Sequence, residues 1–457
     1  MNRVLTTFTS GLLVSLMLTT TAVAQTDDAV AEAMKAPGAK ITLPVSVVRE
    51  GFDKEFVDSA REQFSNFHMQ LGGDHALYYT THFTEFVPAA MALSSGSVSV
   101  LARRPMSELA DLTYTMGDGS TSQSLAAHIH DPDSRVQGVM ILHKGVVVYE
   151  AWPGMRPEQL HLWASVAKSM VGTLLTMLEA EGKVDTSRPI TDFVPALQGS
   201  EWDSVPLIAA MNMASGLDIS EDAEATMNPR SMFQRVVGAD FGVPNADGVV
   251  EDEMDVLRDA KQIEDEAAGE VARYSSVITK VLVAVVEDLT GQTYTSYVED
   301  RIWSHIGARS PLVINLSPQG LAVGYGLLHS TLEDLARYAL IFTPSWKVVS
   351  DVSLVAPEVL RKMQTGSSRE AYSAGDFPEH SWVKANFGQD MPIFNSHQWD
   401  AVWEDGALFK HGNLYQGIYV DPPRDTVAVY FSTSPVNLAP DLVPGYLREA
   451  AKKLATR

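Results

Sequence analysis

The chain alternates between short apolar runs bounded by turn residues and longer stretches in which apolar positions follow helical spacing. Two apolar runs, 138–142 and 146–149, are separated by a His-Lys-Gly turn, a pattern that predicts a β-hairpin. Two further runs, 416–420 and 426–432, flank a turn with two prolines and predict a second antiparallel pair. An amphipathic helix is expected from residue 445 onward.

Helical patterns fill the middle of the chain. From Ser165 onward, apolar residues at positions 170, 171, 174, 175 and 178 form one stripe that ends near Gly182, which predicts a central helix. The stretch 277–289 is apolar over most of its surface and predicts a buried helix. The acidic stretch 218–270 is only weakly periodic and is interpreted as an insertion or a rim loop.

Strands near both ends with helices between them predict the fold class. We expect an α/β (α+β) fold, in which one antiparallel sheet is built from both termini and flanked by helices, with a mainly helical lobe inserted at about 185–320. This main domain is predicted to span 118–457. Residues 25–117 carry no chemical motif and predict an accessory region, with a strand at 41–48 and a helix near 52–67.

The first 24 residues have the organisation of a secretory signal. Arg3 is followed by an uncharged stretch and Ala22-Val23-Ala24, so cleavage is expected after Ala24 and the protein is predicted to be periplasmic or secreted. No later apolar run is long enough to cross a bilayer, and there is no cysteine for a disulfide or a thiolate metal site. The formal net charge of −23 argues against nucleic acid and anionic membranes as partners. The oligomeric state stays open.

Ser165 and Lys168 form the first candidate chemical motif, at the start of the central helix. Residues three apart share a helix face, so the lysine amine can reach the serine hydroxyl and activate it as a nucleophile. The free N–H groups of the helix start favour the oxyanion that forms when a carbonyl is attacked. The same partial positive charge disfavours protonated Lys168 and helps it to accept a proton. Spacing alone leaves open a solvated lysine on an ordinary helix turn.

Tyr274-Ser275-Ser276 lies directly before the predicted buried helix and supplies a second candidate group. A tyrosine is ordinarily a poor base because its pKa is near 10, but a nearby ammonium such as that of Lys168 can lower this pKa. Tyr274 is therefore expected to pass the Ser165 proton to the leaving group. For an isolated tyrosine, a core position with a satisfied hydroxyl would be the simpler interpretation.

The segment Lys410-His411-Gly412-Asn413 precedes the first C-terminal strand and supplies a third group. Gly412 would let a substrate approach the backbone closely, and the Asn413 N–H could be a second oxyanion donor beside the Ser165 N–H. His411 is the one histidine that we expect to line the pocket. An edge-strand glycine with two solvated basic neighbours is the alternative interpretation.

In this order, the three groups resemble those of the serine β-lactamase and penicillin-binding-protein superfamily. Tyr274-Ser275-Ser276 stands where class C enzymes have Tyr-x-Asn, and Lys410-His411-Gly412 stands where they have Lys-Thr-Gly. Over about 138–457, the chain resembles most closely the 6-aminohexanoate-dimer hydrolases and the class C-like (family VIII) esterases. The matching stretches are HLWASVAKSMVG at 161–172, SGLDISED at 215–222, YSSVITKVL at 274–282, GLLHSTLEDLAR at 326–337, GSSREA at 366–371 and YVDP at 419–422.

The resemblance implies a two-lobed fold and a covalent acyl-enzyme, with no metal and no cofactor. It assigns Ser165 as the nucleophile, with Lys168 and Tyr274 as its proton-transfer partners. The residues expected to bind the oxyanion or the substrate are Asn413, Gly412, His411 and Ser276.

Departures from the family pattern bear on the substrate. Nylon-dimer hydrolases carry tyrosines near the loop that corresponds to 218–222, where they assist amide cleavage, whereas this chain has Ile219, Ser220 and Ala223. Ser276 and His411 replace the asparagine and threonine that help β-lactamases to hold their antibiotic. A small-molecule ester is therefore the expected substrate, and a short amide is second.

Other functions fit the sequence less well. The run His128-Ile129-His130-Asp131 hints at zinc, but it lacks the H-x-H-x-D-H order of metallo-hydrolases. No G-x-S-x-G nucleophile elbow occurs. Within the serine chemistry, a 6-aminohexanoate-oligomer amidase, a DD-peptidase and a β-lactamase stay open. A non-catalytic cell-wall peptide-binding protein is a further alternative, but the joint presence of the three catalytic candidates favours an enzyme.

Overall fold

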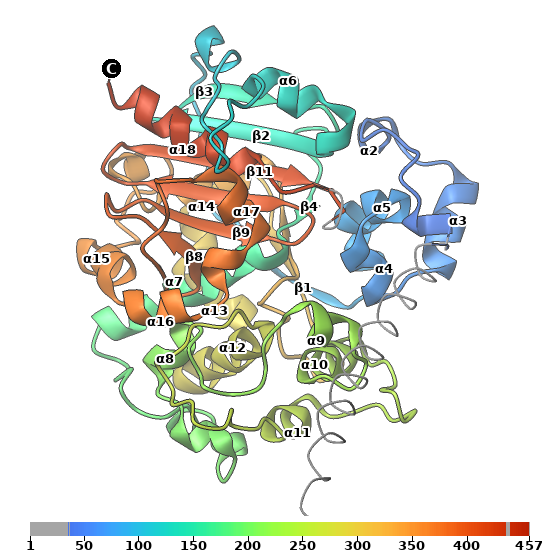
Figure 1. The fold of residues 1–457 in the computed structure, drawn as a ribbon, viewed down its shortest axis with the longest axis vertical. Coiled ribbons are helices and arrows are strands. Elements are labelled where there is room, and N and C mark those ends of the chain that lie inside the picture. Colours follow the sequence, from blue (N-terminus) through green and yellow to red (C-terminus); the bar gives the residue numbers. More distant parts are fainter. Residues whose placement is uncertain (1–34, 36, 436–438, 457) are drawn as a thin grey trace, which may run out of the picture.

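The computed structural model describes residues 35, 37–435 and 439–456, and its larger sheet is antiparallel with seven strands (Figure 1). In sheet order, the strands are β3 (Val146–Ala151), β2 (Val136–His143), β11 (Thr426–Ser432), β10 (Gln416–Asp421), β9 (Leu408–Gly412), β8 (Trp399–Val402) and β7 (Phe394–Ser396). The predicted hairpin pairs β2 with β3, and β11 joins β2 to the C-terminal strands. The predicted fold class is confirmed.

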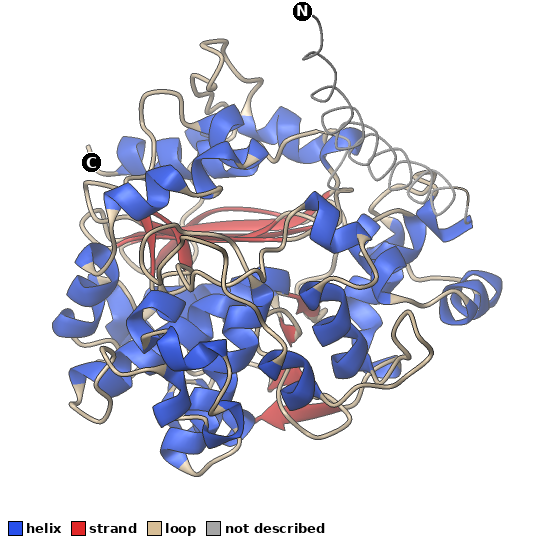
Figure 2. Ribbon diagram, turned by 60° about the horizontal axis from the view of Figure 1, so that its bottom comes forward, coloured by secondary structure: helices blue, strands red, loops and turns tan. Residues whose placement is uncertain are grey.

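Helices cover both faces of this sheet (Figure 2). Side chains alternate along a strand, so Val427 and Val429 of β11 enter the core that includes α14 (Leu332–Leu340), whereas Tyr430 packs with α18 (Val443–Leu454). The predicted C-terminal helix is thus confirmed. Other helices of this part of the chain are α6 (Leu125–His130), α15 (Pro357–Thr365), α16 (Arg369–Ala374) and α17 (Ser381–Asn386).

The predicted central helix is α7 (Lys168–Ala180), which follows the 3-10 turn Ala164–Ala167. Its apolar positions are buried, and Gly182 just after it has a φ of 69°, which suits glycine at a helix end. The predicted buried helix is α12 (Ser276–Thr290), which packs against α7. The start of each helix therefore brings one predicted motif to the same place.

A mainly helical lobe follows α7 in the chain, as predicted, and occupies the lower part of the molecule in Figure 1. The acidic stretch 218–270, interpreted from the sequence as an insertion or a loop, includes three short helices. Each starts at an Asp or Ser whose side chain accepts a backbone N–H, which is ordinary N-capping. Besides α12, the lobe contains α8 (Leu207–Met211), α9 (Ala223–Met227), α10 (Met232–Phe241), α11 (Glu253–Arg258) and α13 (Tyr294–Arg301).

A second, four-stranded antiparallel sheet was not predicted from the sequence. Its order is β1 (Ala89–Ala92), β5 (Leu312–Asn315), β6 (Leu328–Ser330) and β4 (His161–Leu162). The strands have two to four residues, too few to show periodicity in the sequence. The sheet joins the expected accessory region, through β1, to the strand just before Ser165.

Helices dominate the N-terminal part of the described chain: α2 (Val47–Glu50), α3 (Lys54–Glu62), α4 (Asn66–Leu71) and α5 (Asp74–His82). The strand predicted at 41–48 is wrong, because the N–H groups of Thr42 and Leu43 donate to the Asp74 carboxylate instead of a neighbouring strand. The predicted signal, 1–24, lies outside the described residues. No helix in the described ranges is both long and apolar enough to span a bilayer.

Candidate active site

Ser165 lies in a turn whose backbone is held in an unusual conformation. The preceding residue, Ala164, has a φ of 45°, in the left-handed region that costs an L-residue about 1–2 kcal/mol. Strand β9 ends against this turn, and a Cβ on Gly412 would lie 2.8 Å from the Trp163 carbonyl oxygen. The absence of a side chain at Gly412 thus admits the turn that carries Ser165, and the expected approach of a substrate to this glycine stays a prediction.

Lys168 makes three polar contacts with its amine. Its Nζ lies 2.9 Å from Ser165 Oγ, 2.9 Å from Ser276 Oγ and 2.9 Å from the carbonyl oxygen of Tyr325. The side chain is fully buried, and no carboxylate of the described residues forms an ion pair with it. The predicted pair of Ser165 and Lys168 is therefore in direct contact.

Burial controls the protonation of this amine. It lowers the pKa of Lys168 to about 7, the charge of Lys410 adds to the effect, and the charges of Glu221 and Asp400 oppose it. Near pH 7, a large fraction of the amine is therefore neutral. A neutral amine 2.9 Å from a serine hydroxyl can accept its proton.

Tyr274 lies beside two lysines but is not a phenolate. Its ring centre is 5.1 Å from Lys168 Nζ and 4.7 Å from Lys410 Nζ, and its hydroxyl oxygen is 3.4 Å from Lys410 Nζ. Burial and the charges of Asp400 and Glu221 raise the pKa of Tyr274 well above its ordinary value. The expectation that an ammonium lowers this pKa is wrong, because burial has the largest effect and raises it, and the carboxylates of distant segments add to that effect. Tyr274 keeps its proton at neutral pH.

The segment after α16 supports Tyr274 from its other side. The Tyr274 N–H donates to Asp376 at 3.1 Å, and the ring packs edge-on against Phe377 and His380. Burial raises the pKa of Asp376 to about 6. These contacts hold the tyrosine in one position beside Lys410.

Asp400 is a site residue that sequence reasoning missed. It lies on β8, and Lys410 Nζ on the neighbouring strand β9 approaches its Oδ1 to 2.6 Å. Both side chains are almost fully buried. Burial lowers the pKa of Lys410, and Asp400 opposes that effect. No motif marks Asp400, because a cross-strand neighbour becomes visible only when the register is known.

Glu221 is a second residue that was missed, although it lies in the SGLDISED stretch that carries the family resemblance. The Ser276 hydroxyl donates to its carboxylate, and the Ser276 N–H donates to the same oxygen at 3.1 Å. Ser276 therefore contacts Lys168 on one side and Glu221 on the other. This position was expected to contact substrate, and the structure places it behind Lys168.

The two predicted oxyanion donors lie on adjoining segments. Asn413 follows Gly412, which packs on the turn that carries Ser165. In the described part of the chain, neither the Ser165 N–H nor the Asn413 N–H takes part in the backbone hydrogen bonds of the turns and loops. The Asn413 side chain donates to the carbonyl of Gln70 in α4 at 3.1 Å. The oxyanion role of these two groups stays a prediction.

His411 points away from the lysines. Along β9, Leu408 enters the core that includes α7, and Phe409 enters the core that includes α18. Alternation then puts Lys410 on the Ser165 side and His411 on the other. The ring stacks on Trp382, and its Nε2 lies 3.0 Å from Asp441 Oδ2. The expected pocket contact of this side chain is therefore corrected.

The side chains of the histidine run considered for zinc do not point to a common site. His128 is buried with its ring stacked on Tyr446, whereas His130 is exposed on the surface. Among the described residues, no three His, Asp or Glu side chains are grouped so as to hold a metal ion.

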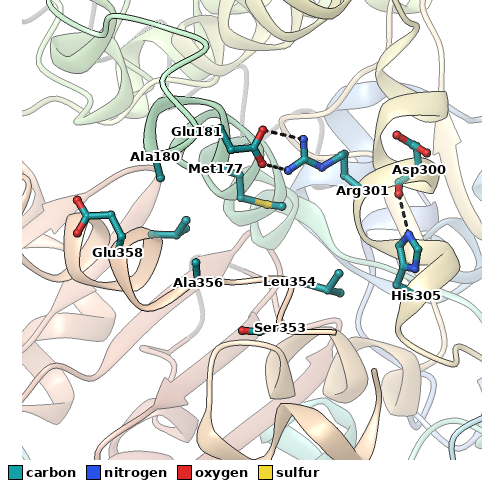
Figure 3. A pocket seen from close by; sticks show the side chains of 11 residues that line it. Met177, Ala180, Glu181, Asp300, Arg301, His305, Ser353, Leu354, Ala356 and Glu358 are labelled. Atoms are coloured by element: carbon teal, nitrogen blue, oxygen red, sulfur yellow. Dashed lines mark hydrogen bonds and ion pairs between the residues drawn. The ribbon is translucent and has the colours of Figure 1, made fainter. Parts of the chain in front are cut away.

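A cavity of about 350 Å³ lies at the opposite end of α7 (Figure 3). From the helical rise, this end is about 18 Å from Lys168. Met177 and Leu354 line it, and Glu181 pairs with Arg301 at its wall. None of the predicted site residues lines this cavity; they lie at the other end of the helix.

Comparisons with known proteins bear on the family and the fold. The family model described as Beta-lactamase matches residues 125–452. The 6-aminohexanoate-dimer hydrolase of Paenarthrobacter ureafaciens is 27% identical over 322 residues, which are 68% of this chain and 77% of that protein. A solved Bacillus anthracis structure described as that type of hydrolase has a TM-score of 0.64 at 20% identity, covering 83% of this chain and 93% of its own. For EstCE1, a hydrolase with promiscuous acyltransferase activity, the TM-score is 0.51 at 17% identity, with 70% and 94% covered.

Proposed function

The chain belongs to the Beta-lactamase family, and from this premise we propose that it is a serine hydrolase that forms an acyl-enzyme on Ser165. One observation carries the proposal. The buried Lys168 amine lies 2.9 Å from Ser165 Oγ, and burial lowers its pKa to about 7. A base with a pKa near the working pH combines a sufficient neutral fraction with a sufficient affinity for the proton.

Acylation begins when Ser165 Oγ attacks the carbonyl carbon of the substrate. The hydroxyl proton passes to Lys168, which becomes an ammonium with donors for Ser276 and the Tyr325 carbonyl. The carbonyl oxygen gains the negative charge, and the N–H groups of Ser165 and Asn413 are assigned to bind it.

Tyr274 is assigned to the leaving group. Because its pKa is raised, it holds a proton that it can donate to the departing alkoxide as the bond to the acyl carbon breaks. Lys410, whose Nζ lies 3.4 Å from the Tyr274 hydroxyl oxygen, then returns a proton to the tyrosine and regains one at the expense of the Lys168 ammonium. Lys168 is neutral again, and the acyl group remains on Ser165.

Deacylation repeats these steps with water as the nucleophile. Lys168 takes a proton from the attacking water, the bond between the acyl carbon and Ser165 Oγ breaks, and the proton returns to Ser165. The carboxylic acid product leaves, and the site is restored.

The proposed substrate is a small carboxylic ester. An alkoxide needs less help to leave than an amine does, and this chain lacks the loop tyrosines that assist amide cleavage in the nylon-dimer hydrolases. A short amide is the second candidate, because a curated relative is a 6-aminohexanoate-dimer hydrolase. We also propose that 1–24 is an export signal, that 25–117 is the accessory region and that 118–457 is the hydrolase domain.

The test compares the mature protein with Ser165→Ala. Release of p-nitrophenol from acetate and butyrate esters is measured beside turnover of nitrocefin and of 6-aminohexanoate dimer. We expect ester turnover that depends on Ser165 and little lactam or amide cleavage. Preferred cleavage of the dimer would support the amidase instead. If no substrate acylates Ser165, a non-catalytic binding protein becomes the better account.

A further inference from the structure

Glu221 lies at the far end of a hydrogen-bond chain that reaches the nucleophile. The Ser276 hydroxyl donates to its carboxylate, and the Ser276 N–H donates to the same oxygen at 3.1 Å. Glu221 is fixed in turn, because its own N–H donates to the Tyr274 carbonyl at 2.9 Å. Ser276 is buried at the first residue of α12. The carboxylate therefore holds one defined position behind Ser276.

Counting donors gives the direction of each hydrogen bond in this chain. A carboxylate only accepts, so the single hydroxyl proton of Ser276 lies toward Glu221. Ser276 Oγ can then only accept from Lys168 Nζ, 2.9 Å away. The Tyr325 carbonyl, also 2.9 Å from Nζ, is an acceptor too. Both N–H bonds of a neutral Lys168 amine are therefore already used.

The remaining position on the Lys168 nitrogen faces Ser165 Oγ at 2.9 Å. In the neutral amine, this position holds the lone pair, and after proton transfer it holds the third N–H. We propose that Glu221 is a positioning residue, which holds the Ser276 proton and so directs the Lys168 lone pair at the Ser165 hydroxyl. The inference rests on the proposed function, since it concerns the base of the same nucleophile.

Glu221 also acts through its charge. Burial lowers the pKa of Lys168 to about 7, and the negative charge of Glu221 opposes that effect by favouring the ammonium. The titratable groups that face Lys168 from the surrounding elements are Glu221, Lys410, Asp400, Tyr274 and Tyr325. Of these, Glu221 is bonded to the serine that contacts the amine. Removing its charge should lower the pKa of Lys168 further.

Two variants separate the contribution of geometry from that of charge. In Glu221→Gln, the amide can donate to Ser276 Oγ, which frees the Ser276 proton to compete for the Lys168 lone pair. We expect acylation of Ser165 to slow by about 10- to 100-fold and the acid limb of its pH profile to move to lower pH. Ser276→Ala breaks the same hydrogen bond but keeps the charge of Glu221. Acylation of Ser165 should therefore slow, while the acid limb of its pH profile stays in place.

Asp222→Asn is the matched control. It removes an equal charge from the adjacent residue, which is exposed and caps α9 by accepting the Ala225 N–H. Asparagine is an equally good cap, and Asp222 makes no contact with Ser276 in the described structure. Its rate and pH profile should match those of the wild type.

The readout is the labelling of Ser165 by a fluorophosphonate from pH 5 to pH 9. A bond forms between Ser165 Oγ and phosphorus, fluoride leaves, and the serine proton goes to Lys168, so the rate reports the base without a known substrate. Thermal unfolding of each variant is measured alongside. A folded Glu221→Gln protein that is labelled at the wild-type rate overturns the proposal, and an acid limb at the wild-type position shows that the charge of Glu221 does not act on Lys168.

A double variant adds an independent outcome. Both changes break the same hydrogen bond between Glu221 and Ser276, so the double variant should be labelled at about the rate of the slower single variant. If the fold-reductions in labelling rate of the two single variants multiply in the double variant, the proposal is overturned. If Glu221→Gln does not fold, Ser276→Ala takes its place as the test. Labelling of Ser276→Ala at the wild-type rate would then overturn the proposal. If wild-type Ser165 is not labelled at all, the proposed function fails. If the wild type is labelled and the variants equal it, only the role of Glu221 fails.

Discussion

Two fully buried lysines, Lys168 at the site and Lys280 in the helical lobe, are held in opposite ways. The Lys280 amine lies 2.6 Å from Asp240 and 2.6 Å from Glu253, both almost fully buried. Burial alone would lower the pKa of Lys280, but the two carboxylates raise it above its ordinary value. Lys168 has no carboxylate in direct contact among the described residues, and burial lowers its pKa to about 7.

The comparison teaches that two carboxylates in direct contact outweigh the effect of burial at Lys280, whereas burial prevails at Lys168, which has no such partner. At the site, neither nearby carboxylate is in direct contact with Lys168. Glu221 accepts a hydrogen bond from Ser276, and Asp400 forms an ion pair with Lys410. Their charges still stabilise the ammonium after proton transfer, but neither holds the proton on the resting amine.

Tyr325 connects the candidate active site around Lys168 with the ionic centre, which consists of Lys280, Asp240 and Glu253. Its carbonyl accepts from Lys168, whereas its hydroxyl donates to Asp240 at 2.6 Å. One residue thus serves the base through its backbone and the ionic centre through its side chain. Variants at the two lysines and at Tyr325 can therefore test whether the centres are separate in function.

The largest effect is expected for Lys168→Met. The variant removes the base but keeps an apolar side chain in the same space, so Ser165-dependent ester turnover should fall by at least about 1000-fold. Stability at pH 7 should be unchanged or higher, because a buried ionisable group is replaced by a hydrophobic one. Steady-state kinetics and urea unfolding measure the two quantities. Turnover near the wild-type level would show that Lys168 is not the base.

Lys280→Met should have the opposite profile. It leaves the carboxylates of Asp240 and Glu253 buried without their cation, which is expected to cost about 3–5 kcal/mol of unfolding free energy. Turnover per folded molecule should fall far less than in Lys168→Met. Urea unfolding with a parallel active-site titration checks both points. A variant as stable as the wild type would break the contrast between the two lysines.

The pH dependence should also differ. The pKa of Lys168 in the folded protein lies below the ordinary value of 10.5, so the unfolded chain binds more protons between about pH 7 and pH 10. Wild-type stability relative to Lys168→Met should therefore rise from pH 7 to pH 9. The pKa of Lys280 is raised, so its contribution is complete below its ordinary pKa and is lost only above it. Stability relative to Lys280→Met should stay constant over that range.

Enzyme activity offers a second view of the same titration. Because neutral Lys168 is the proposed base, kcat/KM should fall below about pH 7, by tenfold for each pH unit. Asp376, whose pKa is raised to about 6, supports the Tyr274 backbone and should steepen the decline near pH 6. An acid limb near pH 4 would show that a group other than Lys168 limits the reaction.

The two centres differ in what the sequence could predict. Ser165 and Lys168 are three residues apart at a helix start, and Tyr274 opens a helix of obvious apolar character, so local patterns indicated all three. The fold class followed from the order of strands and helices. Lys280 was visible only as one polar residue in that apolar helix, and nothing local links it to Asp240, 40 positions away.

Distant partners also explain the errors at the site. Tyr274 was expected to have a lowered pKa, because the nearby Lys168 could be foreseen, whereas the burial of the tyrosine and the carboxylates of Asp400 and Glu221 could not. His411 was expected in the pocket, because the register and alternation of β9 were not known. Contacts between segments that are far apart in the chain produce no local sequence pattern, so a single sequence does not reveal them.

The smallest effect is expected for Tyr325→Phe, which removes the hydroxyl that donates to Asp240 and keeps the carbonyl that accepts from Lys168. Loss of a buried hydrogen bond to a carboxylate should cost about 1.5–3 kcal/mol of unfolding free energy. The acid limb of kcat/KM should stay at the wild-type position, since the partners of the Lys168 amine are unchanged. A displaced acid limb would instead show that the charge of the ionic centre reaches Lys168. The two lysines would then belong to one electrostatic unit, because Tyr325 would transmit the state of Asp240 to the base.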